Sequence, residues 1–442
     1  MRTRIKNAWV VTMNAQRDVL PATDIWVEDD RIVGIGRYSL PADHVIDATG
    51  YVAMPGLIQP HIHLCQTLFR GAADDLRLLD WLQQKIWPLE SALDASAMRA
   101  AADLGLAELI QSGTTTILDM GSVAHTDQIF EAVQASGLRA WAGKCLMDRP
   151  NPWLQESRHD AIHESRTLIE RWHGADNGRI QYALAPRFTL SVTDALWEET
   201  LELALATGVV IHTHASETLD EVDEAKRLHV LAPLAHLNAL DVTRAHVVAA
   251  HGVWLTDEEL AIAEEKRVGL AHCPSSNLKL GSGIAPVPRW LQAGLTFGIA
   301  ADGAPCNNWL DGFTEMRMAS LLAKPAFGAQ AFPAEEVLAK ATIGGAEVLG
   351  AQHTIGSLEV GKQADLILVD IQGLHHTPDA VASIYSQLVY QTRATDVHLT
   401  MVAGRILYHD GQFFTMNPES VRANARSALK RTVEKAYDKG FV

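Results

Sequence analysis

The chain has 442 residues, of which 48% are hydrophobic, so it can fill one large barrel with an accessory domain or two to three ordinary domains. Its formal net charge of -16 argues against a nucleic-acid groove or an anionic membrane surface as a partner, which favours a small-molecule substrate. No apolar run approaches membrane-spanning length, and the four cysteines are widely spaced without a C-x-x-C pair. We therefore expect free thiols, no membrane partner and a cytoplasmic location.

The first 50 residues alternate apolar and polar positions in short runs, which predicts strands, including a hairpin at 25–36. From residue 51 to about 350, short apolar runs alternate with longer amphipathic stretches, a pattern typical of repeated βα units. Strand patterning then returns, and a closing helix is expected at the end of the chain. The predicted barrel strands are 51–60, 114–119, 139–145, 180–185, 209–214, 246–251, 268–272 and 296–302, the later strand segments are 359–370 and 396–414, and the helix is 418–438.

This order predicts an α/β fold, a (β/α)8 TIM-type barrel with a small β-sandwich domain built from both termini. The two terminal β segments are expected to pair with each other, and the accessory domain offers surface for a homo-oligomer. The expected division is 1–55 for the first part of the sandwich, 56–355 for the barrel, 356–415 for the second part of the sandwich and 416–442 for a C-terminal helix.

Two histidines close the first predicted barrel strand, His61 and His63. In extended backbone, residues two apart project to the same side, so both imidazoles can converge on one metal ion. Two histidines at a strand end are also common as plain surface residues. The pair therefore needs support from the rest of the chain.

Three other predicted strands end on groups that bind metals or move protons: His214 on the fifth, His251 on the sixth and Asp302 on the eighth. In a parallel eight-stranded barrel all these ends lie at one mouth. Three histidines and one carboxylate supply the ligands that suit zinc or iron(II), with a water completing the shell. We expect one Zn2+ per chain, with Fe2+ as the alternative, held by His61, His63, His214 and Asp302.

Glu217 follows His214 by three residues. A carboxylate just beyond a metal-binding strand end can take a proton from the water that the metal activates and pass it to a leaving group or a ring nitrogen. A glutamate directly after Ser216 is also a common helix-cap arrangement. The nearby ligands favour the acid/base role, with Asp302 or His251 as further proton acceptors, and they indicate deaminase-like chemistry.

These motifs give the chain a resemblance to the amidohydrolase superfamily over nearly its whole length. Within that superfamily it is most similar to the deaminases of S-adenosylhomocysteine, methylthioadenosine and 5'-deoxyadenosine, a group that also includes triazine chlorohydrolases. The motifs for the superfamily are Pro-Gly-Leu-Ile at 55–58 with the His-Ile-His at 61–63, and the segments 214–217, 250–252, 271–277 and 301–304; those for the deaminases are 70–75, 81–82, 87–90 and 277–280.

The resemblance implies a mononuclear barrel with the metal on the four ligands named above, Glu217 as proton shuttle and His251 near the activated water. The implied reaction converts a 5'-substituted adenosine to the inosine analogue and ammonia. By the same resemblance Glu90 would hold the ribose hydroxyls, because a carboxylate can accept two neighbouring O–H groups. An acidic residue in the first turn of a helix is also common for electrostatic reasons.

Two positions depart from the pattern of the adenosine-type enzymes. Arg187 stands where those enzymes usually carry a histidine, which is closer to guanine deaminases, and it can donate to a purine carbonyl or ring nitrogen. Lys144 stands where we expect an arginine and can replace its charge. Trp87 is a candidate for stacking on the base, and His251 is a further candidate for contact with the substrate. A guanine, 8-oxoguanine or other N-heterocycle aminohydrolase and a triazine chlorohydrolase are therefore the alternatives.

Two more distant interpretations remain. In a binuclear cyclic-amide hydrolase, a carboxylated Lys144 would bridge two metals, with His214 and His251 on the second, but the bridging lysine resembles a fourth-strand residue and Lys144 ends the third. A non-catalytic binding barrel would bury the same polar groups without a metal, which is costly. The metal content of the protein would distinguish the three interpretations. We expect about one bound metal ion per chain for the deaminase, two for the binuclear hydrolase and none for the binding barrel.

Overall fold

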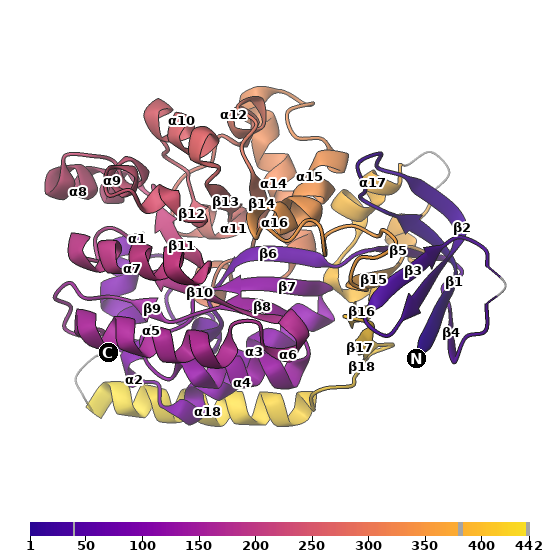
Figure 1. Ribbon diagram of the computed structural model, residues 1–442, viewed down its shortest axis with the longest axis horizontal. Coiled ribbons are helices and arrows are strands. Elements are labelled where there is room, and N and C mark those ends of the chain that lie inside the picture. The colour runs from indigo at the N-terminus through magenta and orange to yellow at the C-terminus, as the bar shows by residue number, and fades with distance from the viewer. Residues whose placement is uncertain (39, 379–382, 439–442) are drawn as a thin grey trace.

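The computed structural model describes residues 1–38, 40–378 and 383–438. Its barrel is a sheet of eight parallel strands with the order β14-β13-β12-β11-β10-β8-β7-β6, and the short β9 pairs with β10 (Figure 1). The ring closes where Ile62 bridges to Asp302 and the Asp302 backbone N–H donates to the carbonyl of His61 across 3.3 Å. The strands are β6 (Leu57–Ile62), β7 (Thr114–Asp119), β8 (Arg139–Ala142), β9 (Cys145–Leu146), β10 (Ile180–Pro186), β11 (Val210–Ala215), β12 (Val247–His251), β13 (Gly269–His272) and β14 (Phe297–Ile299).

The predicted strand 51–60 is wrong as one element, because it is divided between two sheets at Gly56. The residues before Gly56 form β5 (Tyr51–Pro55) in the terminal sheet, and those after it begin the barrel. Gly56 donates its N–H to the Asp365 carbonyl, and a Cβ at this position would collide with the side chain of Thr115. Both sheets bury this run, so its apolar character conceals the break.

Helices cover the outside of the barrel, and several begin with a side chain that accepts a backbone N–H of the first turn. These caps are Asp94, Ser157, Thr193, Thr218 and Thr256. The helices from α1 to α16 are α1 (Leu78–Trp81), α2 (Trp87–Ala92), α3 (Ala95–Gln111), α4 (Thr126–Ser136), α5 (Arg158–Trp172), α6 (Ala175–Gly178), α7 (Asp194–Thr207), α8 (Leu219–His229), α9 (Pro233–Ala239), α10 (Asp257–Lys266), α11 (Pro274–Lys279), α12 (Val287–Gln292), α13 (Ala304–Asn307), α14 (Gly312–Phe327), α15 (Ala334–Ala341) and α16 (Ile343–Val348). Short 3-10 or π segments are η1 (Leu64–Phe69), η2 (Leu82–Ile86) and η3 (Val242–Arg244).

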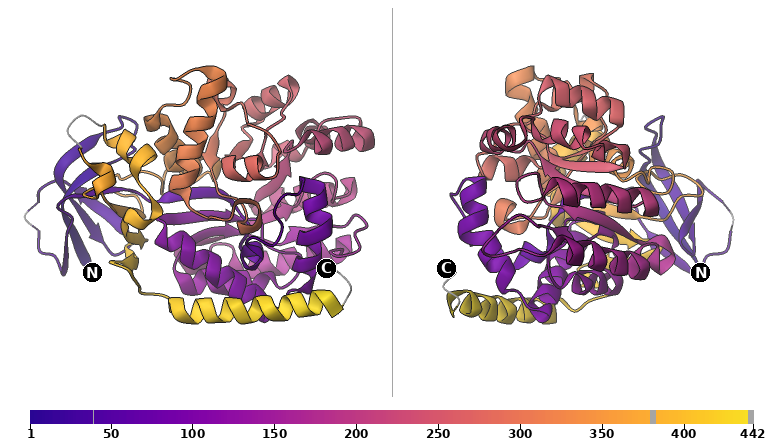
Figure 2. Two further views of the ribbon diagram at one scale, coloured as in Figure 1. Left: turned by 180° about the vertical axis from the view of Figure 1, so that it is seen from behind. Right: turned by 60° about the vertical axis from the view of Figure 1, so that its left-hand side comes forward.

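The second sheet combines strands from both ends of the chain in the order β18-β17-β16-β15-β5-β1-β2-β3, with β4 on β1. The expected pairing of the terminal segments is confirmed, since β5 runs antiparallel to β15 with Ala53 opposite Leu368. The sheet encloses a small apolar core of its own and lies beside the barrel (Figures 1 and 2). Its other strands are β1 (Arg2–Val11), β2 (Val19–Glu28), β3 (Arg31–Ile35), β4 (His44–Asp47), β15 (Leu366–Asp370), β16 (Val397–Val402), β17 (Arg405–His409) and β18 (Gln412–Phe413).

Three features complete the fold. The buried pair of Arg139 Nε and Asp365 Oδ2, 2.6 Å apart, joins the barrel to the terminal sheet. Between β15 and β16 the chain forms short segments, η4 (Leu374–His376), α17 (Ile384–Ser386), η5 (Gln387–Gln391) and η6 (Ala394–Asp396). The closing helix α18 (Pro418–Asp438) runs along the outside of the barrel (Figure 2). The boundaries given above for the domains stay a prediction.

Among the described residues, no helix combines the length and the apolar character needed to span a membrane. The four cysteines are buried and free.

Candidate active site

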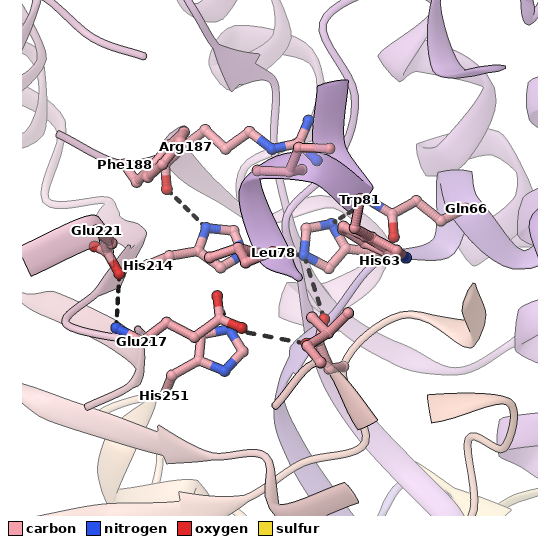
Figure 3. Close-up of a pocket in the computed structure, with 13 residues that line it drawn as sticks. His63, Gln66, Leu78, Trp81, Arg187, Phe188, His214, Glu217, Glu221 and His251 are labelled. Atoms are coloured by element: carbon pink, nitrogen blue, oxygen red, sulfur yellow. Dashed lines mark hydrogen bonds and ion pairs between the residues drawn. The ribbon is translucent and has the colours of Figure 1, made fainter. Parts of the chain in front are cut away.

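The ends of β6 and β11 and the segment after β14 bring three histidines and one aspartate together inside the barrel mouth. His63 Nε2 lies 3.1 Å from His214 Nε2. Asp302 Oδ1 lies 3.3 Å from His61 Nε2 and 3.5 Å from His63 Nε2. The four side chains named as metal ligands from the sequence therefore lie in one cluster, in which His214 is partly buried and the other three are buried, and part of it is visible in Figure 3.

These spacings fit a metal ion. A tetrahedron with metal–ligand bonds of about 2.0–2.1 Å has edges of about 3.3–3.4 Å, which matches the distances between the ligand atoms. Among the described residues, His61 Nε2 is buried without a hydrogen-bond partner. Ring nitrogens that face one another beside a carboxylate, one of them without a partner, are an arrangement that a divalent cation satisfies.

Neighbouring groups fix the orientation of the ligands. The Nδ1–H of His214 donates to the Arg187 carbonyl across 2.7 Å, which leaves Nε2 free to bind a metal. His61 Nδ1 lies 2.8 Å from His212 Nε2, and the Ser276 hydroxyl donates to Asp302 Oδ2 across 2.6 Å. His212 was not among the predicted site residues, although its spacing from His214 repeats that of His61 and His63.

The charge states of the cluster suit metal binding. Burial lowers the pKa of His63 and His214 well below the ordinary value, so both rings are neutral. Burial alone would raise the pKa of Asp302, but the surrounding histidines, His61 first, hold it well below its ordinary value. The set is therefore neutral imidazoles with one carboxylate.

Glu217 and His251 stand next to the cluster and face each other, with 3.5 Å between Glu217 Oε2 and His251 Nε2 (Figure 3). The Ser282 hydroxyl donates to Glu217 Oε1 across 3.1 Å. His251 Nδ1 donates to Asn277 Oδ1 across 2.9 Å, which directs Nε2 toward Glu217 and toward Asp302 Oδ2 at 3.8 Å. Burial raises the pKa of Glu217, which keeps this carboxyl able to carry a proton.

Backbone geometry at the strand ends is unusual. Ser216, His251 and Asp302 have φ values of 54°, 74° and 67°, in the left-handed region that non-glycine residues seldom adopt. Such conformations cluster at functional sites, where the surrounding structure holds them in place. Here they turn the chain at the ends of strands so that the neighbouring side chains point into the barrel mouth.

Glu221 fixes the backbone under Glu217. Its Oε2 accepts the N–H of Glu217 across 2.7 Å, and its Oε1 accepts the N–H of Ser216 across 3.1 Å. Burial raises the pKa of Glu221 to about 7. Glu221 was not among the predicted site residues, although its position in the first turn of a helix, four residues after Glu217, is a signal in the sequence.

A cavity opens above the cluster, and both charged and apolar side chains line it. One wall comes from α1 and the π-helical η2, a type of segment that is frequent at functional sites. Trp81 lines the cavity, and its indole N–H has no hydrogen-bond partner among the described residues. The apolar side chains of the lining are Leu78, Trp81, Leu82, Phe188 and Leu280.

Of the residues predicted to bind substrate, Arg187 and His251 line this cavity. Arg187 pairs with Glu90, with Nη1–Oε2 and Nη2–Oε1 distances of 2.9 and 3.2 Å, and Gln66 Nε2 donates to Glu90 Oε1 across 2.7 Å. These contacts use three of the roughly four lone pairs of the Glu90 carboxylate. Gln66 and Arg187 line this cavity, whereas Glu90 stands behind them and lines a separate hollow.

The structure does not bring Lys144 or Trp87 to this cavity. Lys144 Nζ forms ion pairs of 2.9 Å with Glu156 and Glu164 and donates to the Val123 carbonyl. These partners neutralise the ammonium and leave it unlike a lysine that bridges two metals. Trp87 lines a separate hollow next to Met147 and Leu79.

Comparison with known proteins agrees with this geometry. The sequence model of the amidohydrolase family matches residues 52–407. A 5-methylthioadenosine/S-adenosylhomocysteine deaminase from Moorella thermoacetica is 41% identical, over 92% of this chain and 94% of the relative, and a 5'-deoxyadenosine deaminase from Methanosarcina acetivorans is 38% identical over 98% of both. The crystal structure of an adenosine deaminase from Xanthomonas campestris with bound zinc is 33% identical and superposes with a TM-score of 0.92 over 98% of both chains.

Proposed function

The chain belongs to the amidohydrolase family, and from this premise we propose that it is a zinc-dependent hydrolytic deaminase of 5'-substituted adenosines. The substrates are 5'-deoxyadenosine, methylthioadenosine or S-adenosylhomocysteine, and the products are the inosine analogue and ammonia. The observation that carries the proposal is Glu217 beside a cluster of three histidines and an aspartate, at a cavity lined by charged and apolar side chains. The names of the relatives favour the nucleoside class.

Zinc bound by His61, His63, His214 and Asp302 would act as a Lewis acid that makes a water molecule nucleophilic near neutral pH. Side chains of the protein carry out the proton transfers. As the water oxygen adds to the amine-bearing ring carbon, the water proton passes to Asp302 or to His251 Nε2, which lie 3.8 Å from each other at the cluster.

Glu217 carries the proton that the ring needs. It protonates the ring nitrogen next to the reacting carbon, which cancels the charge that would otherwise build there. The proton that Asp302 or His251 took from the water then passes to the amine, and ammonia leaves. The hydroxyl on the ring carbon returns its proton to Glu217 as the carbonyl forms and the ring recovers its aromaticity. Ser282 holds one Glu217 oxygen while the other faces His251, so the carboxyl stays within reach of a proton donor and acceptor.

Recognition of the nucleoside divides between two surfaces of the cavity. The apolar wall from α1 and η2 suits the base and the 5' substituent. The network of Gln66, Glu90 and Arg187 supplies charged and amide groups at the cavity edge, and we assign the ribose hydroxyls to it. The four buried free thiols suit a reducing compartment, and we place the reaction in the cytoplasm.

Removing a ribose hydroxyl from the substrate tests this assignment without disturbing the protein. We expect kcat/KM to fall by about 10- to 100-fold from 5'-deoxyadenosine to its 2'- or 3'-deoxy analogue, because a hydrogen bond to a charged group contributes roughly 1.5–3 kcal/mol. In a Glu90→Gln variant the penalty should shrink, whereas Glu258→Gln, at an exposed position, should leave it unchanged. Equal kcat/KM values for all three nucleosides would contradict the sugar assignment.

A guanine-type base is the second candidate, and Arg187 is the observation that favours it. Its guanidinium lines the cavity, and the pairing with Glu90 leaves N–H groups that can donate to a purine carbonyl. The same site chemistry would also displace chloride from a triazine ring, so the substrate has to be decided by turnover.

A further inference from the structure

A second cluster of metal-binding side chains lies outside the barrel, in the connection between the adjacent strands β15 and β16. His375 and His376 belong to η4, which follows β15, and Asp396 ends η6, directly before β16. The three side chains thus meet where the connection leaves the terminal sheet and where it returns.

The ligand atoms all lie within 4.8 Å of one another, close enough to converge on one cation. Asp396 Oδ2 lies 2.8 Å from His375 Nε2 and 3.6 Å from His376 Nε2. The ring centroids of the two histidines are 4.4 Å apart and tilted by 44°, so the rings are not stacked face to face. Separations of about 3.3 Å between ligand atoms are those expected around a zinc ion with bonds of about 2.0–2.1 Å.

An ion pair between His375 and Asp396 explains only part of this cluster. The His376 side chain is fully buried, and neither of its ring nitrogens has a hydrogen-bond partner among the described residues. The amide oxygen of Gln391, whose side chain interacts with the His376 ring, is also buried without a partner in the same part of the chain. Buried nitrogens and oxygens of this kind need a ligand to replace the water they have lost.

We propose that His375, His376 and Asp396 bind a second zinc-like divalent cation, separate from the one in the barrel, with Gln391 or a water as the fourth ligand. Two imidazoles, one carboxylate and one further oxygen are a ligand set that zinc accepts. No acid/base residue comparable to Glu217 stands among the described neighbours named here, so the role of this site is structural.

The site has a structural task that follows from its position. The connection that it closes also packs on the barrel, where the Arg317 guanidinium donates to the Tyr390 carbonyl and Ser320 Oγ lies 2.7 Å from the Tyr390 hydroxyl. A cation that ties the two ends of the connection together lowers the entropy cost of holding it in place. It would therefore stabilise the junction between the barrel and the terminal sheet.

The test is the metal content of the untagged, full-length protein after zinc loading and dialysis against metal-free buffer. We expect about two zinc ions per chain in the wild type and about one in a His375→Ala/His376→Ala variant, whose deaminase activity stays near that of the wild type. The matched control is His159→Ala/His163→Ala, which removes an exposed pair of neighbouring histidines beside Asp160 and should keep about two zinc ions.

A measurement on the wild-type protein covers the case in which the variant does not fold. Crystals grown with zinc should give an anomalous peak at the zinc edge about 2.0–2.1 Å from the ring nitrogens of His375 and His376. About one zinc ion per chain, with an anomalous peak at the barrel cluster only, would overturn the proposal. If the double variant still bound about two zinc ions per chain, the proposal would also be overturned. Both ions would then belong to the barrel, as in a binuclear hydrolase.

Discussion

Replacing Glu217 with glutamine is expected to lower kcat for 5'-deoxyadenosine by about 10²- to 10⁴-fold, the range that a positioned acid/base group contributes. The amide keeps the shape of the side chain and can still accept the hydrogen bond from Ser282, but it cannot carry a proton to the ring nitrogen. Glu217 is not among the four predicted metal ligands, so the zinc content should stay at the wild-type value. The comparison therefore separates proton transfer from metal binding.

The control for this variant is the same substitution at an exposed glutamate, Glu258→Gln on α10, which should leave both kcat and zinc content unchanged. Steady-state ammonia release and metal analysis on the same protein samples give both quantities. Wild-type-like kcat in Glu217→Gln would refute the shuttle role. Loss of zinc from that variant would instead show that Glu217 holds the metal.

Loss of a metal ligand should abolish activity by a different route. His214→Asn removes one of the four ligands, so we expect the barrel zinc to be lost and turnover to fall to background. His212→Asn, on the same strand, removes only the group 2.8 Å from His61 Nδ1. A supporting contact of this kind is worth about 10- to 100-fold in metal affinity, so His212→Asn should be active at high zinc and inactive at low zinc.

Zinc titration of the metal-free proteins, followed by activity at each zinc concentration, measures this difference. If His214→Asn recovered wild-type activity at any zinc concentration, His214 would not be a ligand. If His212→Asn titrated like the wild type, the contact with His61 would have no part in holding the metal.

The barrel was predictable from the sequence because its strands are short apolar runs between amphipathic helices. The metal cluster was predictable because its histidines and its aspartate lie at or just after the ends of those strands. His61, His63, His214 and Asp302 are far apart in the sequence, yet parallel strands in a barrel leave their ends at a single mouth. That topological rule places the four side chains together without any knowledge of their contacts.

What the sequence did not reveal depends on packing between distant segments. The buried pair of Glu90 and Arg187 joins residues 97 positions apart, so the two roles assigned to them separately belong to one network. Trp81 lines the cavity where Trp87 was expected, and the two residues flank the π-helical η2. Lys144 is neutralised by glutamates on the α5 side of the barrel, a contact that no local pattern encodes.

The measurement that tests the central claim most directly is ammonia release by the zinc-quantified protein, with 5'-deoxyadenosine, methylthioadenosine, S-adenosylhomocysteine, adenosine, guanine, 8-oxoguanine and a chlorotriazine compared side by side. We predict that a 5'-substituted adenosine has the highest kcat/KM and gives the corresponding inosine analogue. Turnover of guanine-type bases alone would make Arg187 the residue that selects the ring, and chloride release without ammonia would contradict deamination altogether.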